Sequence, residues 1–354
     1  MSTQAIPPPR LEIPESSVCM TVRIIDTGAR LGGFTKTMLE PAYPGHELLT
    51  DLPAFPFLIE HNSGKKVIFD LGIRKDPENF SPMMVKQWHA QQVLFRGTKD
   101  VVDTLEEGGV KKEEIDSVIW SHWHFDHTGD TLRFSSSTEL VVGPGFSEAL
   151  IPGYPKNKDS PILESDYNFY LLNAPGHAVG HINALARTTP DTFIFMGGDT
   201  CHHCGEFRPT KYKPLPDEIS PSPLSDPPFR PGTTCPGAVL QSIHRSKSAT
   251  EPFYVVAGTG QDFYDDDDKN SSKETKEDTS INEARRETLE TLGKLTEFDA
   301  HDNILTVIAH DGSIVDFLEY YPKSANSWKV KGWKPASEWR FLADFKGAVN
   351  AVKA

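Results

Sequence analysis

Cysteines and long apolar runs are scarce in this chain of 354 residues. Its four cysteines are scattered, which argues against a disulfide framework; they are Cys19, Cys201, Cys204 and Cys235. No segment approaches the roughly 18 uninterrupted apolar residues of a membrane-spanning helix, and residues 1–14 lack the apolar core of a signal peptide. These absences predict a soluble cytoplasmic protein with no membrane partner.

Positive charge is also in short supply. Lys and Arg number 36 against 50 Asp and Glu, which gives a net charge of −14. Because an acidic surface repels a phosphate backbone, nucleic acid is not expected as a substrate or partner. A Gly-X-Ser-X-Gly motif is absent, so nothing indicates a serine nucleophile. The expected ligand is a small molecule, and the sequence leaves the oligomeric state open.

Histidines, in contrast, are concentrated in the segment Ser121-His-Trp-His-Phe-Asp-His-Thr-Gly129, directly after the apolar run 116–120. The run has the contiguous apolar character of a buried strand. Imidazole and carboxylate are the usual ligands of zinc and similar ions. His122 and His124 can project to one side, and Asp126 and His127 can face a second point. Four ligands so close together suggest two metal ions.

The pattern His-X-His-X-Asp-His after an apolar strand resembles the signature of the metallo-β-lactamase superfamily. Four further motifs occur in the family's order, at Asp70-Leu-Gly72, Pro175-Gly-His177, Gly197-Gly-Asp199 and the strand end at His310. The resemblance implies an α/β fold, the four-layer αββα sandwich of this superfamily. It also implies a first metal on His122, His124 and His177, a second on Asp126, His127 and His310, and Asp199 bridging the two.

Other site residues are less firmly indicated. Asp70 is expected to orient ligands from outside the metal sphere, although an ordinary turn before Gly72 would also use Asp. His181 is expected to form hydrogen bonds rather than to bind metal. Asp126 is expected to handle protons as well. His202 and His203 lie in a CxxC segment interpreted as a loop at the rim of the site; His202 is the candidate catalytic residue and His203 a candidate for the substrate pocket, and ordinary loop roles are the alternative.

Two aromatic residues of the histidine segment, Trp123 and Phe125, are candidates for flanking a flat substrate ring, with packing as the alternative. Chain organisation is predicted as an N-terminal arm, residues 1–20, and one catalytic domain, residues 21–354. Within the domain we expect a substrate-shaping insertion at about 205–250 and an acidic loop at about 264–280. Nine prolines from Pro209 to Pro236 predict that the insertion is an extended excursion over the surface. Helices are expected over 101–107 and 281–298.

The resemblance implies hydrolysis, in which a hydroxide bridging two divalent metals attacks a carbonyl carbon. Zinc is the first expectation, with manganese or iron as alternatives because these ligands discriminate poorly. The segment Asp199 to Pro209 is similar to fungal members that open small lactam or lactone rings, including benzoxazolinone γ-lactamases. The expected role is then detoxification of such a compound. A thioesterase acting on acyl-carrier-protein or coenzyme A thioesters is the alternative, and a binding module that has lost catalysis is a second.

Overall fold

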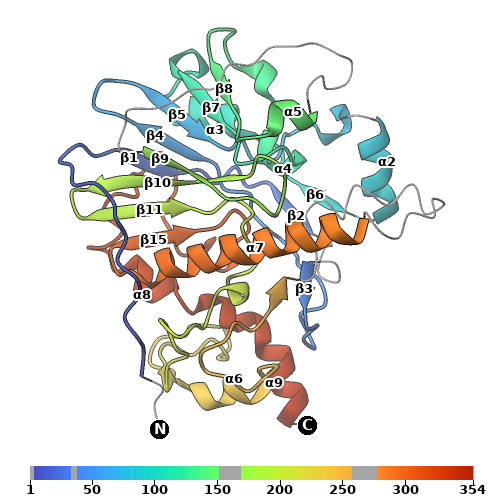
Figure 1. The fold of residues 1–354 in the computed structure, drawn as a ribbon, viewed down its shortest axis with the longest axis vertical. Helices are drawn as coiled ribbons and strands as arrows, with labels where there is room; N and C mark the ends of the chain where they lie inside the picture. Colours follow the sequence, from blue (N-terminus) through green and yellow to red (C-terminus); the bar gives the residue numbers. More distant parts are fainter. Residues whose placement is uncertain are drawn as a thin grey trace.

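The computed structural model describes residues 4–32, 38–80, 82–91, 93–150, 169–256 and 277–353, and two β-sheets lie at its centre (Figure 1). The first sheet has the order β1-β4-β5-β7-β8, with strands Thr21–Ile24, Phe57–Glu60, Lys66–Phe69, Ser117–Ile119 and Glu139–Val141. The second has the order β15-β11-β10-β9, with strands Ile304–Val307, Thr192–Met196, Ile182–Thr189 and Phe169–Asn173. Within them β5, β7 and β8 run parallel, as do β11 and β15.

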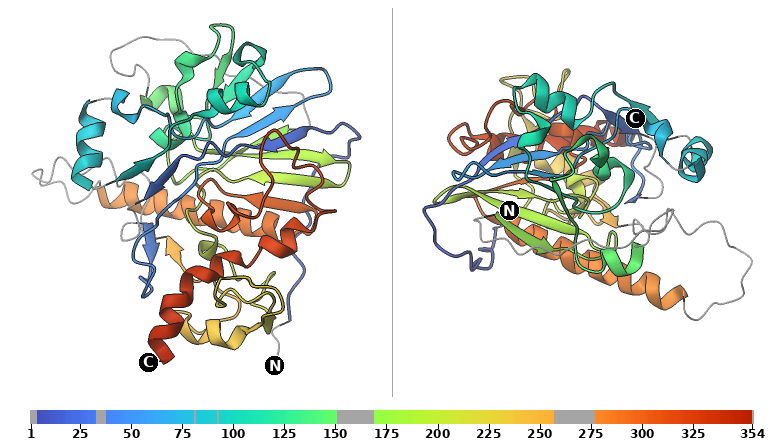
Figure 2. Two further views of the ribbon diagram at one scale, coloured as in Figure 1. Left: turned by 180° about the vertical axis from the view of Figure 1, so that it is seen from behind. Right: turned by 90° about the horizontal axis from the view of Figure 1, so that it is seen from above.

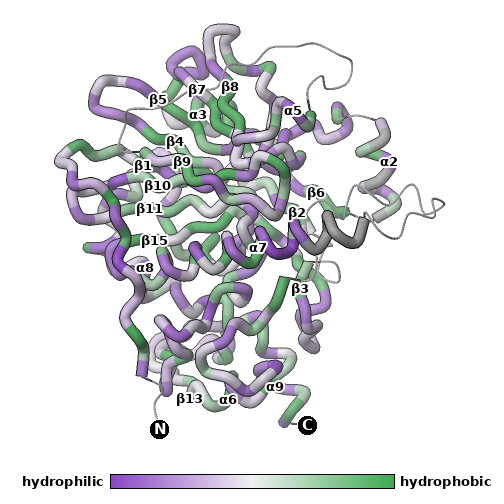
Figure 3. The backbone as a smooth tube through the Cα atoms, in the orientation of Figure 1, coloured by the Kyte–Doolittle hydropathy of each residue, from purple (hydrophilic) through white to green (hydrophobic). Residues whose placement is uncertain are grey.

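Alternation along the strands separates the apolar side chains into layers. In β4, Phe57 and Ile59 face the second sheet, whereas Leu58 belongs to a cluster on the outer side of the first. In β11, Ile194 and Met196 face the first sheet in the same manner. Successive side chains of a strand point to opposite faces of the sheet, so both faces of each sheet carry buried apolar side chains. In Figure 3 hydrophobic colours accordingly run along the strands of both sheets.

Helices cover the outer faces. Helix α3 (Val101–Glu107) packs Val102 and Leu105 onto the first sheet, and the long helix α7 (Glu277–Ala300) packs Leu292 and Leu295 onto the second (Figure 1). Helix α3 has the bounds expected from the sequence, and the structure adds a capping box at Asp100. Four layers result, helix, sheet, sheet and helix, and the predicted αββα sandwich is confirmed.

The proline-rich insertion is more ordered than an extended surface excursion. It contains β12 (Glu218–Ile219) paired with β13 (Cys235–Pro236), followed by α6 (Gly237–Ile243). Helix α6 lies beside the C-terminal helix α9 (Lys346–Lys353), and the N-terminal arm reaches the same end of the molecule (Figures 1 and 2). There the amide of Ile6 donates a hydrogen bond to the carbonyl of Lys211. The insertion, the N-terminal arm and the C-terminal helix therefore lie together, below the second sheet in the view of Figure 1.

The remaining elements are short. They are β2 (Arg30–Gly32), β3 (Leu39–Glu40), β6 (Leu94–Arg96), β14 (Val255–Val256), α2 (Pro82–Gln91), α4 (Phe125–Thr128), α5 (Phe146–Leu150), α8 (Trp333–Ser337) and the 3-10 helices η1 (Pro77–Asn79), η2 (Lys112–Glu114), η3 (Thr131–Arg133), η4 (Cys204–Glu206), η6 (Gly312–Ile314) and η7 (Arg340–Phe345). Of the predicted acidic loop, residues 264–276 lie outside the described residues, and residues 277–280 form the first turn of α7. No helix among the described residues is long and apolar enough to cross a membrane.

Candidate metal centre

The candidate ligands follow the carboxyl ends of strands from both sheets. His122 and His124 come directly after β7, and α4 carries Asp126 and His127. Asp199 and His310 follow β11 and β15, which are parallel neighbours, so both strands deliver them to the same edge. His177 lies in the turn between β9 and β10. The meeting point of the two sheet edges therefore gathers side chains that are far apart in the sequence.

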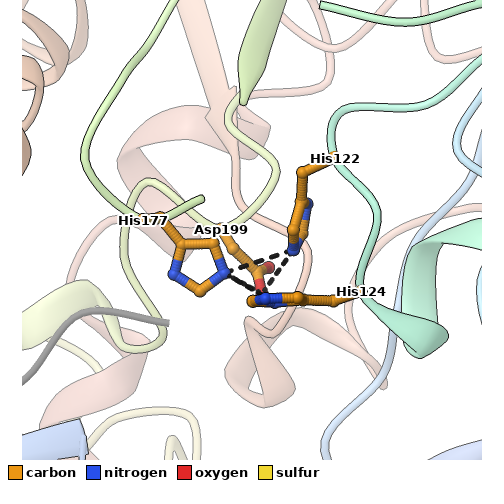
Figure 4. A group of neighbouring side chains, drawn as sticks. All are labelled: His122, His124, His177 and Asp199. Atoms are coloured by element: carbon orange, nitrogen blue, oxygen red, sulfur yellow. Dashed lines mark hydrogen bonds and ion pairs between the residues drawn. The ribbon is translucent and has the colours of Figure 1, made fainter. Parts of the chain in front are cut away.

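The first group consists of His122, His124, His177 and Asp199, whose ligand-type atoms face one another (Figure 4). Nε2 of His177 lies 3.2 Å from Nε2 of His122 and 3.0 Å from Nδ1 of His124. The Oδ2 atom of Asp199 lies 3.4 Å from Nε2 of His177 and 3.7 Å from Nε2 of His122. All four side chains are buried.

The second group consists of Asp126, His127, His310 and again Asp199. Here the other carboxylate oxygen, Oδ1 of Asp199, lies 3.1 Å from Nε2 of His127 and 3.1 Å from Nε2 of His310. The Oδ2 atom of Asp126 lies 3.3 Å from the same nitrogen of His310. One oxygen of Asp199 thus faces each group, which is the arrangement of a carboxylate shared by two ions.

This donor set fits divalent cations. Nε2 of His127 and Oδ1 of Asp199 are buried and lack a hydrogen-bond partner among the described residues, and such orphaned polar atoms are costly unless something binds them. Burial and the neighbouring imidazoles hold the pKa values of His122 and His177 well below the usual range. Both rings are therefore neutral, the form that coordinates a metal.

Hydrogen bonds from outside the cluster fix which ring nitrogens face it. Nδ1 of His127 lies 2.8 Å from Oδ2 of Asp70, and Nδ1 of His310 lies 2.7 Å from the carbonyl oxygen of Pro53. Both acceptors require a proton on Nδ1, so Nε2 is the ring nitrogen that faces the second group and could bind an ion. Asp70 also accepts the amide of Ser121 at 2.6 Å.

His181 contacts Asp199 through the backbone rather than through its carboxylate. Its Nδ1 donates to the carbonyl of Ala174 at 3.0 Å, and its Nε2 accepts the amide of Asp199 at 3.1 Å. Both ring nitrogens are thereby used, and His181 is in neither candidate metal group. Gly198 is needed beside it, because its φ is +45° and a Cβ there would lie 2.9 Å from Nε2 of His181.

The remaining predicted site residues lie in different surroundings. His202 reaches the cluster, with Nε2 3.5 Å from Oδ2 of Asp199 and its ring 5.0 Å from that of His177. Trp123 is half-buried, and its ring lies 4.7 Å from the ring of His124. Phe125 is buried, with its ring 4.7 Å from that of Trp88. Phe125 thus belongs to an apolar wall beside the cluster, so packing accounts for its present contacts.

His203 points away from the cluster, toward His46 and Asp344. These three residues could by distance hold a further ion. Nδ1 of His203, however, accepts the amide of Gly205 at 2.9 Å, so the ring proton sits on Nε2, which lies 3.1 Å from Oδ2 of Asp344. A nitrogen that carries a proton cannot coordinate. His203 therefore links its loop to the C-terminal segment.

Reasoning from sequence missed two residues at the site. The Oγ atom of Ser121 lies 3.0 Å from Nδ1 of His122 and 3.2 Å from Nδ1 of His127, between the two groups. Glu206 is buried and accepts backbone amides of the loop that carries His202. Its spacing, three residues after His203, is that of a capping box, and this pattern could have identified it.

Known proteins are similar to this chain in sequence. A profile described as "Metallo-beta-lactamase superfamily" matches residues 49–204. Gamma-lactamase FDB1 of Fusarium pseudograminearum (strain CS3096) is 38% identical over 98% of this chain and 87% of its own length. Metallo-hydrolase mfmC of Annulohypoxylon moriforme is 38% identical over 97% of this chain and 92% of its own length.

Among solved structures, an N-acyl homoserine lactone hydrolase with the product N-hexanoyl-L-homoserine bound at its catalytic metal centre has the same fold. It superposes with a TM-score of 0.54 at 18% identity and covers 86% of this chain and 99% of its own. The fold, the order of the motifs and the two full-length relatives agree, and the chain belongs to the metallo-β-lactamase superfamily.

Proposed function

We propose that this protein is a dinuclear metallohydrolase that opens a small cyclic amide or ester, a lactam or lactone. The observation that carries the proposal is Asp199, whose two carboxylate oxygens face two separate clusters of buried His and Asp side chains. Two ions that act on the same bond must lie close together, and a carboxylate that faces both groups is expected at such a site. Two zinc ions are the first choice, with manganese or iron as alternatives.

The seven residues of the two groups would hold the ions: His122, His124 and His177 on one, Asp126, His127 and His310 on the other, and Asp199 on both. When bound, such ions supply Lewis-acid polarisation of a carbonyl and a hydroxide nucleophile at neutral pH. Hydrolysis then adds the hydroxyl of water to the carbonyl carbon, breaks the ring C–N or C–O bond and leaves a proton on the departing atom.

Proton transfer falls to Asp126 and His202 in this proposal. Asp126 is buried in the second group, with its Oδ2 atom 3.3 Å from Nε2 of His310, and its carboxylate is the group that would accept a proton. Nε2 of His202 makes no hydrogen bond within the described residues and lies at the edge of the first group. We assign His202 the donation of a proton or hydrogen bond to the departing atom.

The substrate class rests on the relatives. One full-length relative is named a gamma-lactamase, and the structural neighbour is a lactone hydrolase. Ring amides and ring esters both offer a carbonyl carbon to the hydroxide. Our first candidate substrate is a benzoxazolinone-type lactam, and detoxification of such a compound would then be the role of the protein. The relatives give no support to the thioesterase alternative. Cytoplasmic location stays a prediction that cell fractionation tests.

The test is turnover by zinc-loaded protein of 2-benzoxazolinone, N-hexanoyl-L-homoserine lactone and an acyl thioester. We expect ring opening of a lactam or lactone, about two zinc ions per chain, and loss of turnover in His122→Ala. The exposed His89 on α2 provides the control, because His89→Ala should change neither metal content nor rate. A protein that holds one ion, or that hydrolyses only the thioester, would contradict the proposal.

A further inference from the structure

Glu206 is a buried carboxylate inside the turn that carries His202. Its side chain is inaccessible, with the residue 2% exposed. A single oxygen, Oε2, accepts the amide of His202 at 2.7 Å and the amide of His203 at 3.0 Å. Among the described residues no Lys or Arg forms an ion pair with it. Burial raises the pKa of Glu206, against the opposing effects of the His202 ring and of the two amides.

Such a group is expensive to bury, because a carboxylate without a cation loses its hydration and regains only hydrogen bonds. The two amides it binds are those of adjacent peptide units, and they flank the Cα atom of His202. Each peptide unit is planar, so holding both fixes φ and ψ of His202. The direction in which the His202 side chain leaves the backbone is then set by Glu206.

The rest of the turn is held independently of His202. The ring of His203 links Gly205 to Asp344, and Sγ of Cys204 lies 3.2 Å from Oδ2 of Asp311. Neither contact acts on the peptide units beside His202. The ring of His202 itself is stacked parallel to that of His310, with centroids 5.9 Å apart and planes 10° apart. Its Nε2 atom makes no hydrogen bond within the described residues and faces Oδ2 of Asp199 at 3.5 Å.

We propose that Glu206 is a positioning residue, which holds His202 over the two metal groups by binding the amides on either side of its Cα atom. This inference rests on the proposed catalytic role of His202. Glu206 touches neither substrate nor metal and acts only through the geometry of His202.

Two variants separate the hydrogen bonds from the charge. In Glu206→Gln an amide oxygen can accept the same two bonds, and we expect kcat within about threefold of wild type. In Glu206→Ala both amides lose their acceptor, and we expect kcat to fall by about 100-fold, the cost of a misplacement near 1 Å, with KM and zinc content unchanged. Glu206→Ala combined with His202→Ala should be no slower than His202→Ala alone, because the two changes remove the same contribution.

Glu114 offers a matched control. Its Oε1 accepts the amide of Lys111 at 3.1 Å with the same spacing of three residues, at the opposite end of β7 from the site. Glu114→Ala should leave the rate unchanged. Equal losses of kcat for the Gln and Ala variants, or additive losses of Glu206→Ala and His202→Ala, would overturn the positioning role.

Two measurements do not depend on turnover. Hydrogen exchange at the amides of His202 and His203 should accelerate in zinc-loaded Glu206→Ala and stay slow in Glu206→Gln, and crystal structures of both should show the His202 ring displaced only in the former. Unchanged exchange and an unmoved ring in Glu206→Ala would refute the inference even in an active enzyme. Should wild type turn over none of the probes, the proposed function fails, whereas the exchange and the ring position still decide the role of Glu206.

Discussion

The buried ion pair between Arg208 and Asp299 should be a main attachment of the insertion to the sandwich. Nε and Nη2 of Arg208 donate to the two oxygens of Asp299 at 2.9 and 2.6 Å, and the side chains are 6% and 3% exposed. Lys334 and Lys213 lie 3.9 and 4.0 Å from the same carboxylate. Although burial alone would raise the pKa of Asp299, these three cations hold it far below its usual value.

Asp299→Asn keeps the shape of the side chain and removes its charge, which leaves the buried guanidinium of Arg208 without a carboxylate. Removal of one partner from a buried pair costs about 3–5 kcal/mol. The free energy of unfolding, measured by guanidinium denaturation of the zinc-saturated protein, should fall by that amount. Zinc content below the transition should not change, since Asp299 is in neither metal group.

An exposed pair supplies the comparison. Lys99 and Glu107 are 2.6 Å apart, but their side chains are 47% and 59% exposed, so Glu107→Gln should cost less than about 1 kcal/mol. If Asp299→Asn costs no more than Glu107→Gln, the pair at Arg208 does not anchor the insertion, and the reasoning from burial is wrong.

Three further outcomes follow from the site and its surroundings. Chelation of the metal should lower the free energy of unfolding by about 4 kcal/mol for each bound ion, relative to protein at a free zinc concentration 1,000 times the Kd, and a denaturation curve indifferent to chelator would speak against buried ions. Gly198→Ala should reduce zinc per chain as well as stability, because a Cβ at φ +45° strikes His181, which holds the amide of Asp199; full zinc content would contradict this. Burial and His203 lower the pKa of His46 to about 4, so between pH 4 and the ordinary value of 6.5 the unfolded chain binds more protons than the folded one. Stability of the metal-free protein should therefore rise with pH in that window, by up to about 1.4 kcal/mol per unit from this group, and His46→Gln should show a shallower slope.

Sequence patterns were sufficient for the groups that lie at strand ends. The residues after β7, β11 and β15 are local continuations of apolar runs, and the order of the sheets alone brings them together. For the same reason helix α3 could be predicted over residues 101–107. The assignment of these residues as metal ligands stays a prediction until metal content is measured.

What the sequence could not give depends on contacts between distant segments. The turn of His203 toward Asp344 requires the C-terminal segment to pack against the insertion, 141 residues away in the chain. The pairing of Arg208 with Asp299 joins the insertion to the end of α7 across 91 residues. Proline content suggested an extended surface segment, whereas β12 pairs with β13 and α6 packs beside α9, because tertiary contacts override local propensity.

Asp199 also has a consequence for the order in which the centre can be assembled during synthesis. All four residues of the first group are present once the chain has been made as far as Asp199, whereas the second group waits for His310, which is placed only when β15 pairs with β11. A nascent chain can thus complete one cluster long before the other. The second cluster closes only after the last strand of the second sheet has joined, so a fully loaded centre would mark a chain in which that sheet is complete.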